Sequence, residues 1–134
     1  MKEKFTIVVS ILLLMTITEV FCQSIVQRDI TWYSEQNTDL NAAVQLSASC
    51  RIVTHRNQTI DLIWGDTKTF SVVSVDGNWL DPNQEGSLLY HVKYQEVNGE
   101  ITINRIANEI TIVIDFTKEF AAGIREKFII NRFE

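Results

Sequence analysis

The chain has 134 residues, of which 46% are hydrophobic, and its 12 basic and 17 acidic side chains give a net charge of -5. This length fits one domain, and the apolar fraction excludes an intrinsically disordered chain. The acidic balance argues against nucleic acid as a partner, because phosphates bind basic surfaces, and two cysteines are too few for a disulfide scaffold or a four-cysteine zinc site.

The N-terminus has the pattern of a secretory signal peptide. Lys2 and Lys4 precede an apolar run over residues 5–17, which is shorter than the ~20 residues that a membrane-spanning helix needs. We therefore predict a signal peptide over residues 1–22 and a single all-β domain over residues 23–134. The mature domain is expected to be secreted or periplasmic and to contain no membrane span.

Cys22, the last residue of the predicted signal peptide, raises the alternative of a lipid-anchored protein. The residue before a lipidated cysteine is normally small, whereas here it is Phe21, so lipidation is disfavoured. Cleavage after Cys22 leaves Cys50 as the one cysteine of the mature chain. Its place in a strand-like apolar pattern indicates a packed core thiol and not a nucleophile or a bridge between chains.

Alternation of apolar and polar residues with a period of two dominates the mature chain and predicts strands. A strand around residues 25–34 places Trp32 and Tyr33 on opposite faces, so one of the two rings is expected to be partly exposed. A second strand covers residues 44–53. The apolar side chains of this second strand are expected in the core: Val44, Leu46, Ala48, Cys50 and Ile52.

A hairpin follows the second strand. A loop over residues 55–57 pairs Ile52 with Ile60, and Asn57 takes the left-handed conformation in this prediction. Trp64 continues the apolar face of the hairpin and is expected in the core.

The next strand covers residues 68–75 and places Phe70 and Val72 on its core face. It leads into a stretch over residues 76–86 that breaks the alternation and holds the only proline and two of the five glycines. Long loops in compact domains are disproportionately functional, so this loop is where a ligand site is first expected.

The second half of the chain predicts successive hairpins. The Asn-Gly pair at residues 98–99 indicates a tight turn between two alternating segments. A further turn at residues 107–108 sets Ile103 opposite Ile112. A last strand over residues 124–133 brings the total to seven or eight short antiparallel strands, which predict a β-sandwich or a small closed β-barrel. The alternation does not distinguish these two folds.

The loop over residues 76–86 supplies the candidate ligand-binding residues. Trp79 lies outside the alternation, so it is either a lid over an open end of the core or an exposed platform for a sugar ring or another partner. Replacing it with alanine abolishes binding at an unchanged melting temperature if it is a platform, and lowers stability if it is a lid. Asp76, Asn78 and Asp81 add polar groups that suit a glycan.

No other pattern indicates chemistry. No spacing of His, Cys and carboxylate residues predicts a metal site, and His55 and His91 belong to no catalytic motif. We expect no cofactor and, as the first hypothesis, a non-enzymatic domain that binds a glycan or a protein through loops at one end. The alternatives are a small lipocalin-like barrel carrying an apolar ligand, and a minor enzyme or enzyme inhibitor of an exported system. The sequence leaves the oligomeric state open.

Overall fold

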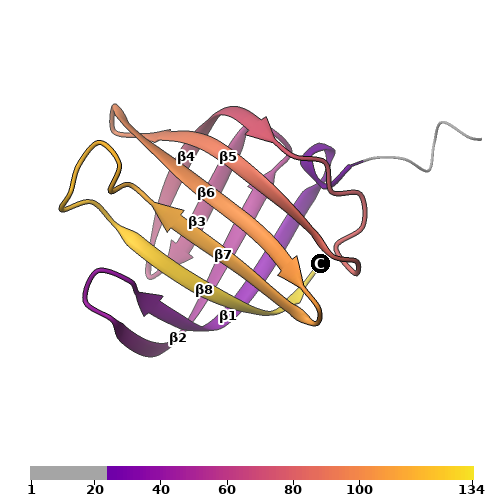
Figure 1. Cartoon of the computed structure of the whole chain (residues 1–134), viewed down its shortest axis with the longest axis horizontal. Helices are drawn as coiled ribbons and strands as arrows, with labels where there is room; N and C mark the ends of the chain where they lie inside the picture. Colours follow the sequence, from indigo (N-terminus) through magenta and orange to yellow (C-terminus); the bar gives the residue numbers. More distant parts are fainter. Residues whose placement is uncertain (1–23) are drawn as a thin grey trace, which may run out of the picture.

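The computed structural model describes residues 24–134, which form a closed barrel of eight antiparallel strands (Figure 1). The predicted signal peptide over residues 1–22 lies outside the described residues. Each strand pairs with the next along the chain, and the last pairs with the first. A 3-10 turn, η1 (Ile25–Gln27), precedes β1 (Asp29–Asp39), β2 (Val44–His55), β3 (Thr59–Trp64), β4 (Asp66–Asp76), β5 (Gly86–Tyr94), β6 (Val97–Ile106), β7 (Glu109–Asp115) and β8 (Arg125–Phe133). The all-β prediction is confirmed, and of its two folds the barrel is the observed one.

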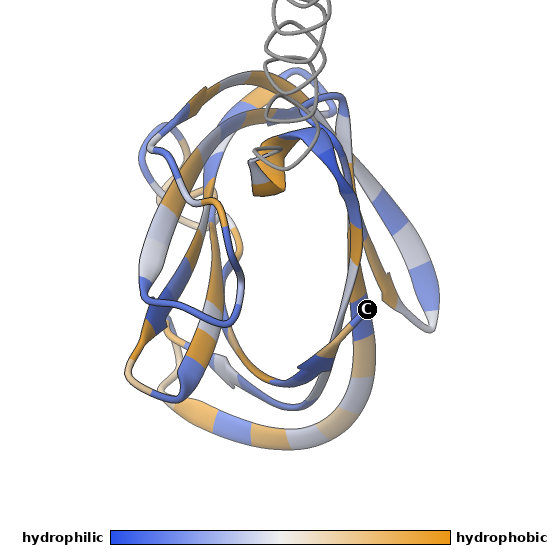
Figure 2. Cartoon of the chain, turned by 90° about the vertical axis from the view of Figure 1, so that its right-hand side faces the viewer, coloured by the Kyte–Doolittle hydropathy of each residue, from blue (hydrophilic) through white to orange (hydrophobic). Residues whose placement is uncertain are grey.

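The barrel interior is filled with large side chains that the period-two alternation turns inward. Figure 2 shows hydrophobic and hydrophilic residues alternating along the strands. All eight strands contribute to this core. The largest fully buried side chains of the strands are Trp32, Ile52, Ile60, Phe70, Leu88, Tyr90, Ile101, Ile103, Ile112, Ile114 and Phe128. In the part of the chain that is described, no helix has the length and hydrophobicity needed to cross a membrane.

One end of the barrel, which we call the η1 end, is closed by η1 and by the loop over residues 77–85. Ile25 is fully buried, and its backbone N–H donates to the carbonyl oxygen of Trp79 at 2.9 Å. Figure 2 shows η1 lying inside the ring of strands. The opposite end, which we call the far end, carries the β1–β2 turn, the β5–β6 turn and the loop over residues 116–124.

The β2–β3 hairpin turns one residue later than predicted. His55 pairs with Thr59, so Ile52 lies opposite Leu62 and not Ile60. The residue in the left-handed region is Arg56, with a φ of 52°. A register change of two residues keeps every side chain on the same face, and for this reason the alternation alone did not determine the pairing.

The β5–β6 turn is also displaced from its predicted position. It lies at Gln95 and Glu96, whose φ values of 49° and 67° are those of a type I′ turn. Gly99 lies inside β6, paired with Val92, and a Cβ atom there would lie 2.5 Å from the ring of Phe116. The glycine therefore provides space for a core ring. The pairing of Ile103 with Ile112 is confirmed.

The first half of β2 is not in the core, contrary to the sequence prediction. Val44 is 47% exposed and Leu46 45%, and Ala48 is only half-buried. The reason is that β3 is shorter than β2. The first residue of β2 that pairs with β3 is Arg51, which lies opposite Ile63. Within residues 44–50, residues 44–47 and Cys50 pair with β1 alone, and the segment extends past the end of β3, toward the far end of the barrel.

Candidate functional site

Trp79 is a lid over the core and not an exposed platform. Its side chain is 2% exposed and stacks on Trp32, with ring centroids 6.2 Å apart and an interplanar angle of 19°. The indole Nε1–H donates to the backbone carbonyl of Gln84 at 2.9 Å, so the polar atom of the buried ring is paired within its own loop. Of the two positions considered for this ring, a lid over the core and an exposed platform, the structure shows the lid.

The three polar residues predicted beside it form no hydrogen bond with the indole, whose Nε1–H is paired with a backbone carbonyl of its own loop. Asp76 ends β4, and its Oδ2 is 2.8 Å from Nε2 of His91 on β5. Asp81 accepts the backbone N–H of Asn83 at 2.9 Å and so stabilises a turn within the loop. Asn78 is exposed. None of the four predicted residues lines the recess on the barrel wall or the recess at the far end, both described below, and a ligand role for the polar three stays a prediction.

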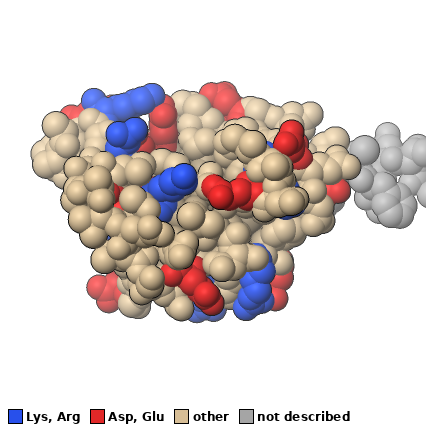
Figure 3. Space-filling model, turned by 60° about the horizontal axis from the view of Figure 1, so that its bottom comes forward, with Lys and Arg blue, Asp and Glu red and all other residues tan. Residues whose placement is uncertain are grey.

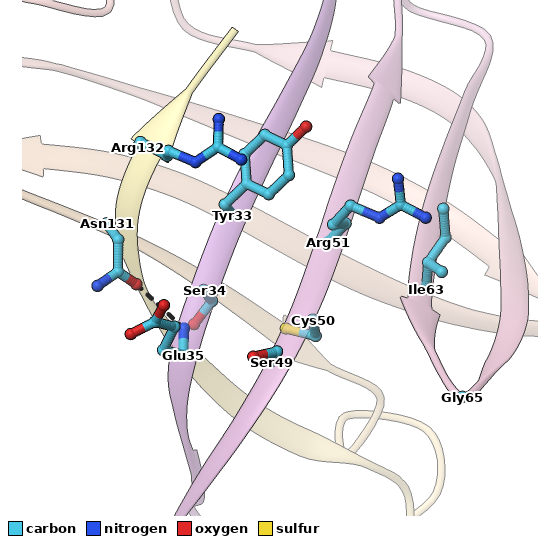
Figure 4. Close-up of a pocket in the computed structure, with 10 residues that line it drawn as sticks. All are labelled: Tyr33, Ser34, Glu35, Ser49, Cys50, Arg51, Ile63, Gly65, Asn131 and Arg132. Carbon is cyan, nitrogen blue, oxygen red and sulfur yellow. Dashed lines mark hydrogen bonds between the residues drawn. The ribbon is translucent and has the colours of Figure 1, made fainter.

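A recess of about 430 Å³ lies elsewhere, on the outer wall of the barrel (Figure 4). We call it the wall groove. It crosses β8, β1 and β2 and reaches the end of β3. Its lining residues are Tyr33, Ser34, Glu35, Ser49, Cys50, Arg51, Ile63, Gly65, Asn131 and Arg132.

A bulge in β1 shapes the wall groove. The pairing of β1 shifts register between Ser34 and Gln36 on both of its edges, against β2 and against β8. Against β8 the extra residue is Glu35 of β1, whereas against β2 two residues, 48–49, lie opposite Glu35. Glu35 donates its backbone N–H to Oδ1 of Asn131 at 3.0 Å, the contact that is dashed in Figure 4. A bulge bends its strand and increases the local twist, which hollows the wall at this point.

One outward-facing row of side chains crosses the wall groove. Arg132, Tyr33, Arg51 and Ile63 occupy neighbouring positions on four adjacent strands. The Arg132 guanidinium carbon lies 3.6 Å from the centroid of the Tyr33 ring, a cation–π contact. The Tyr33 hydroxyl donates to the carboxylate of Glu134, and this hydrogen bond raises the pKa of Tyr33. The hydroxyl is therefore protonated at neutral pH, and the side chain is held by Arg132 of β8 and by Glu134, which directly follows β8.

Arg51 is the unpaired cation of this row. Among residues 24–134 its exposed guanidinium takes part in no ion pair, whereas Arg132 lies 3.7 Å from Glu134. The lining carries two arginines and one glutamate, and Glu134 beside Arg132 adds a second acidic group, so Arg51 is the cation of the groove with which no carboxylate of the described residues pairs. On the face shown in Figure 3 basic and acidic side chains are interspersed, with no broad patch of one sign.

A second recess, of about 260 Å³, lies at the far end. We call it the far-end recess. Phe70, Tyr94 and Phe116 are in mutual aromatic contact there, and the exposed Phe120 of the last loop also lines it. This recess is predominantly apolar and lies above a barrel interior that is filled at this point by Phe70 and Phe116.

Cys50 lines the wall groove but is buried, in agreement with the predicted core thiol. Burial raises its pKa from 9.0 to about 11. We expect iodoacetamide at pH 8 to leave the folded protein unmodified and to alkylate it in urea, as measured by mass spectrometry, because the thiolate is the reactive form. Rapid alkylation of the folded protein would contradict this expectation.

The raised pKa of Cys50 also predicts a pH dependence of stability. The free energy of unfolding should fall as the pH rises from about 9 to 11, since the thiol ionises at lower pH in the unfolded chain than in the folded one.

Sequence reasoning assigned none of the wall-groove residues to a ligand site. Opposite faces for Trp32 and Tyr33 were predicted, and the structure buries Trp32 fully and leaves Tyr33 half-exposed. The alternation placed Arg51 on the polar face of its predicted strand but gave no reason to assign it to a site. Arg132 and Asn131 reach Tyr33 and Glu35 only because β8 closes the barrel on β1, a pairing that no local pattern signals.

Within residues 24–134 no three His, Cys, Asp or Glu side chains form a group able to hold a metal ion. Comparison of the chain with models of protein families, with curated proteins and with solved structures found no significant match.

Proposed function

We propose that the protein is an exported binding domain that holds an acidic glycan in the wall groove. The observation that carries the proposal is the unpaired guanidinium of Arg51 beside Tyr33, whose ring is itself held by Arg132. The ligand class is narrowed from the sequence-based hypothesis of a glycan or protein, and the proposed site differs from it, because that hypothesis placed the ligand at the loops of one end.

The chemistry of the lining suits a carboxylated sugar. A guanidinium binds a carboxylate through two parallel hydrogen bonds, so Arg51 can hold the acid group of a uronic acid. The Tyr33 ring offers an apolar surface for the C–H face of a sugar. Because Oδ1 of Asn131 accepts the N–H of Glu35, the Nδ2 amino group of Asn131 is the part that donates to a sugar hydroxyl.

Replacing Arg51 with glutamine is expected to weaken binding of oligogalacturonic acid about tenfold, which corresponds to ~1.4 kcal/mol. The substitution removes the unpaired cation from an exposed position, so the melting temperature should not change. Isothermal titration calorimetry at low ionic strength measures the affinity. Lys93→Gln is the matched control, because it removes one exposed positive charge from β5, on the opposite side of the barrel.

The methyl ester of the same oligosaccharide separates charge from ring contact. It keeps the sugar rings and loses the carboxylates, so its affinity for the unchanged protein should fall to the level of Arg51→Gln with the acid. Equal binding of acid and ester, or an equal loss in Lys93→Gln, would refute the proposal. Binding of a polyglutamate peptide in place of the oligosaccharide would assign the groove to an acidic protein partner.

The far-end recess favours a second candidate, a carrier of a small apolar ligand, which is the lipocalin-like alternative from the sequence. The supporting observation is the apolar lining formed by Phe70, Phe116 and Phe120. Its volume of about 260 Å³ suits a fragment and not a whole long-chain lipid. Saturable fluorescence enhancement of anilinonaphthalene sulfonate that Phe120→Ser abolishes would support this candidate, and no enhancement would oppose it.

A further inference from the structure

The edge of β2 over residues 44–50, which we call the free edge, has no strand beside it in the described structure. On one side this segment pairs with β1. On its other side, β2 pairs with β3 only from Arg51 onward. Half of the backbone N–H and C=O groups of this segment therefore point away from the sheet. Seven residues are enough for a strand of ordinary length, so the free edge can accept a further strand by backbone hydrogen bonds alone.

The free edge lacks the charged residues and the proline that keep many sheet edges of monomeric proteins apart, and its one irregularity is the register shift against β1 at residues 48–49. Such edges are commonly blocked by lysine, proline or an inward-pointing charge. Residues 40–50, which include the β1–β2 turn, contain no charged residue and no proline in a chain that is 22% charged. One face of the edge instead exposes the apolar side chains of Val44 and Leu46, which can be buried against the side chains of another strand.

We propose that the free edge pairs antiparallel with the free edge of a second copy of this chain, around a two-fold axis. An antiparallel pairing centred on Leu46 sets Leu46 against its counterpart, Val44 against Ala48 and Gln45 against Ser47. Apolar side chains then meet apolar ones on one face, and polar side chains meet polar ones on the other.

The self-complementary register about Leu46 favours a second copy as the occupant, and charge does not oppose it at this edge. Each copy carries a charge of -5, which opposes association over most of the surface, but the uncharged stretch over residues 40–50 brings no like charges together across the axis. The pairing also uses up the exposed edge of each copy. It therefore ends at a dimer and does not continue into a fibre.

The test compares the unchanged protein, exported and processed by the expressing cell, with two variants in analytical ultracentrifugation over a range of concentrations. Leu46→Lys places a charge at the centre of the pairing, and its dimer dissociation constant should rise at least tenfold. Ile106→Lys adds the same charge at another exposed apolar residue, 66% exposed at the end of β6, and should leave the constant unchanged.

Hydrogen exchange of the unchanged protein provides a second measurement that needs no variant. Amides of residues 44–50 should become more protected as the concentration is raised above the dissociation constant, while the rest of the barrel keeps its protection. A protein that is monomeric at all concentrations would overturn the proposal, and so would a dimer that Leu46→Lys does not weaken or whose protection lies outside residues 44–50.

Discussion

Replacing Trp79 with alanine is expected to lower the free energy of unfolding by about 3–5 kcal/mol, the range found for truncation of a buried tryptophan. The ring is 2% exposed and stacks on Trp32 at the η1 end. Its loss leaves a cavity beneath η1 and removes the indole donor to Gln84. Urea unfolding followed by circular dichroism measures the change, with the slope of the transition as a check on two-state behaviour.

The neighbouring residue provides the matched control for this prediction. Leu80 lies in the same loop but is 50% exposed, so Leu80→Ala should cost less than about 1 kcal/mol. An equal effect of the two substitutions would show that the loop is sensitive as a whole and that the lid role of Trp79 is wrong. Unchanged stability in Trp79→Ala would contradict the buried position of the ring.

The second large effect is expected at Gly99, where alanine should destabilise the protein by about 1–3 kcal/mol, the usual cost of overpacking a core. A Cβ atom at this position would lie 2.5 Å from atoms of the Phe116 ring, which packs against Phe70 and Tyr94. The ring must then move, or β6 must shift away from it. Urea unfolding again gives the change in stability.

A double-mutant cycle tests whether the clash with Phe116 is the cause. In a Phe116→Ala background the ring is absent, so the additional change Gly99→Ala should cost at most a few tenths of a kcal/mol. The same cost in both backgrounds would contradict the packing explanation and would favour a backbone requirement at Gly99.

The period-two pattern was sufficient to predict an all-β fold and the inward face of most strands. It predicted the pairing of Ile103 with Ile112, because the turn at residues 107–108 is tight and leaves one register. It failed to predict the pairing in the β2–β3 hairpin, where two registers that differ by two residues leave every side chain on the same face of the sheet. It also failed at Asn98 and Gly99, where a glycine that makes room for a ring has the same sequence signature as a turn glycine.

Long-range geometry limited the prediction of the core and of the candidate site. Val44 and Leu46 have the pattern of core residues, but whether they are covered depends on the length of β3, which ends before it reaches them. The wall groove depends on a bulge at Glu35 and on the closure of β8 against β1. Neither feature has a local signal, so the sequence pointed to the more irregular loop around Trp79.

An NMR titration of the protein with oligogalacturonic acid tests most directly whether the ligand site is on the barrel wall. The wall-groove proposal predicts saturable chemical-shift changes centred on Tyr33, Arg51, Asn131 and Arg132. Saturable changes confined to the loop over residues 77–85, changes confined to the far end, or no changes at all would contradict it.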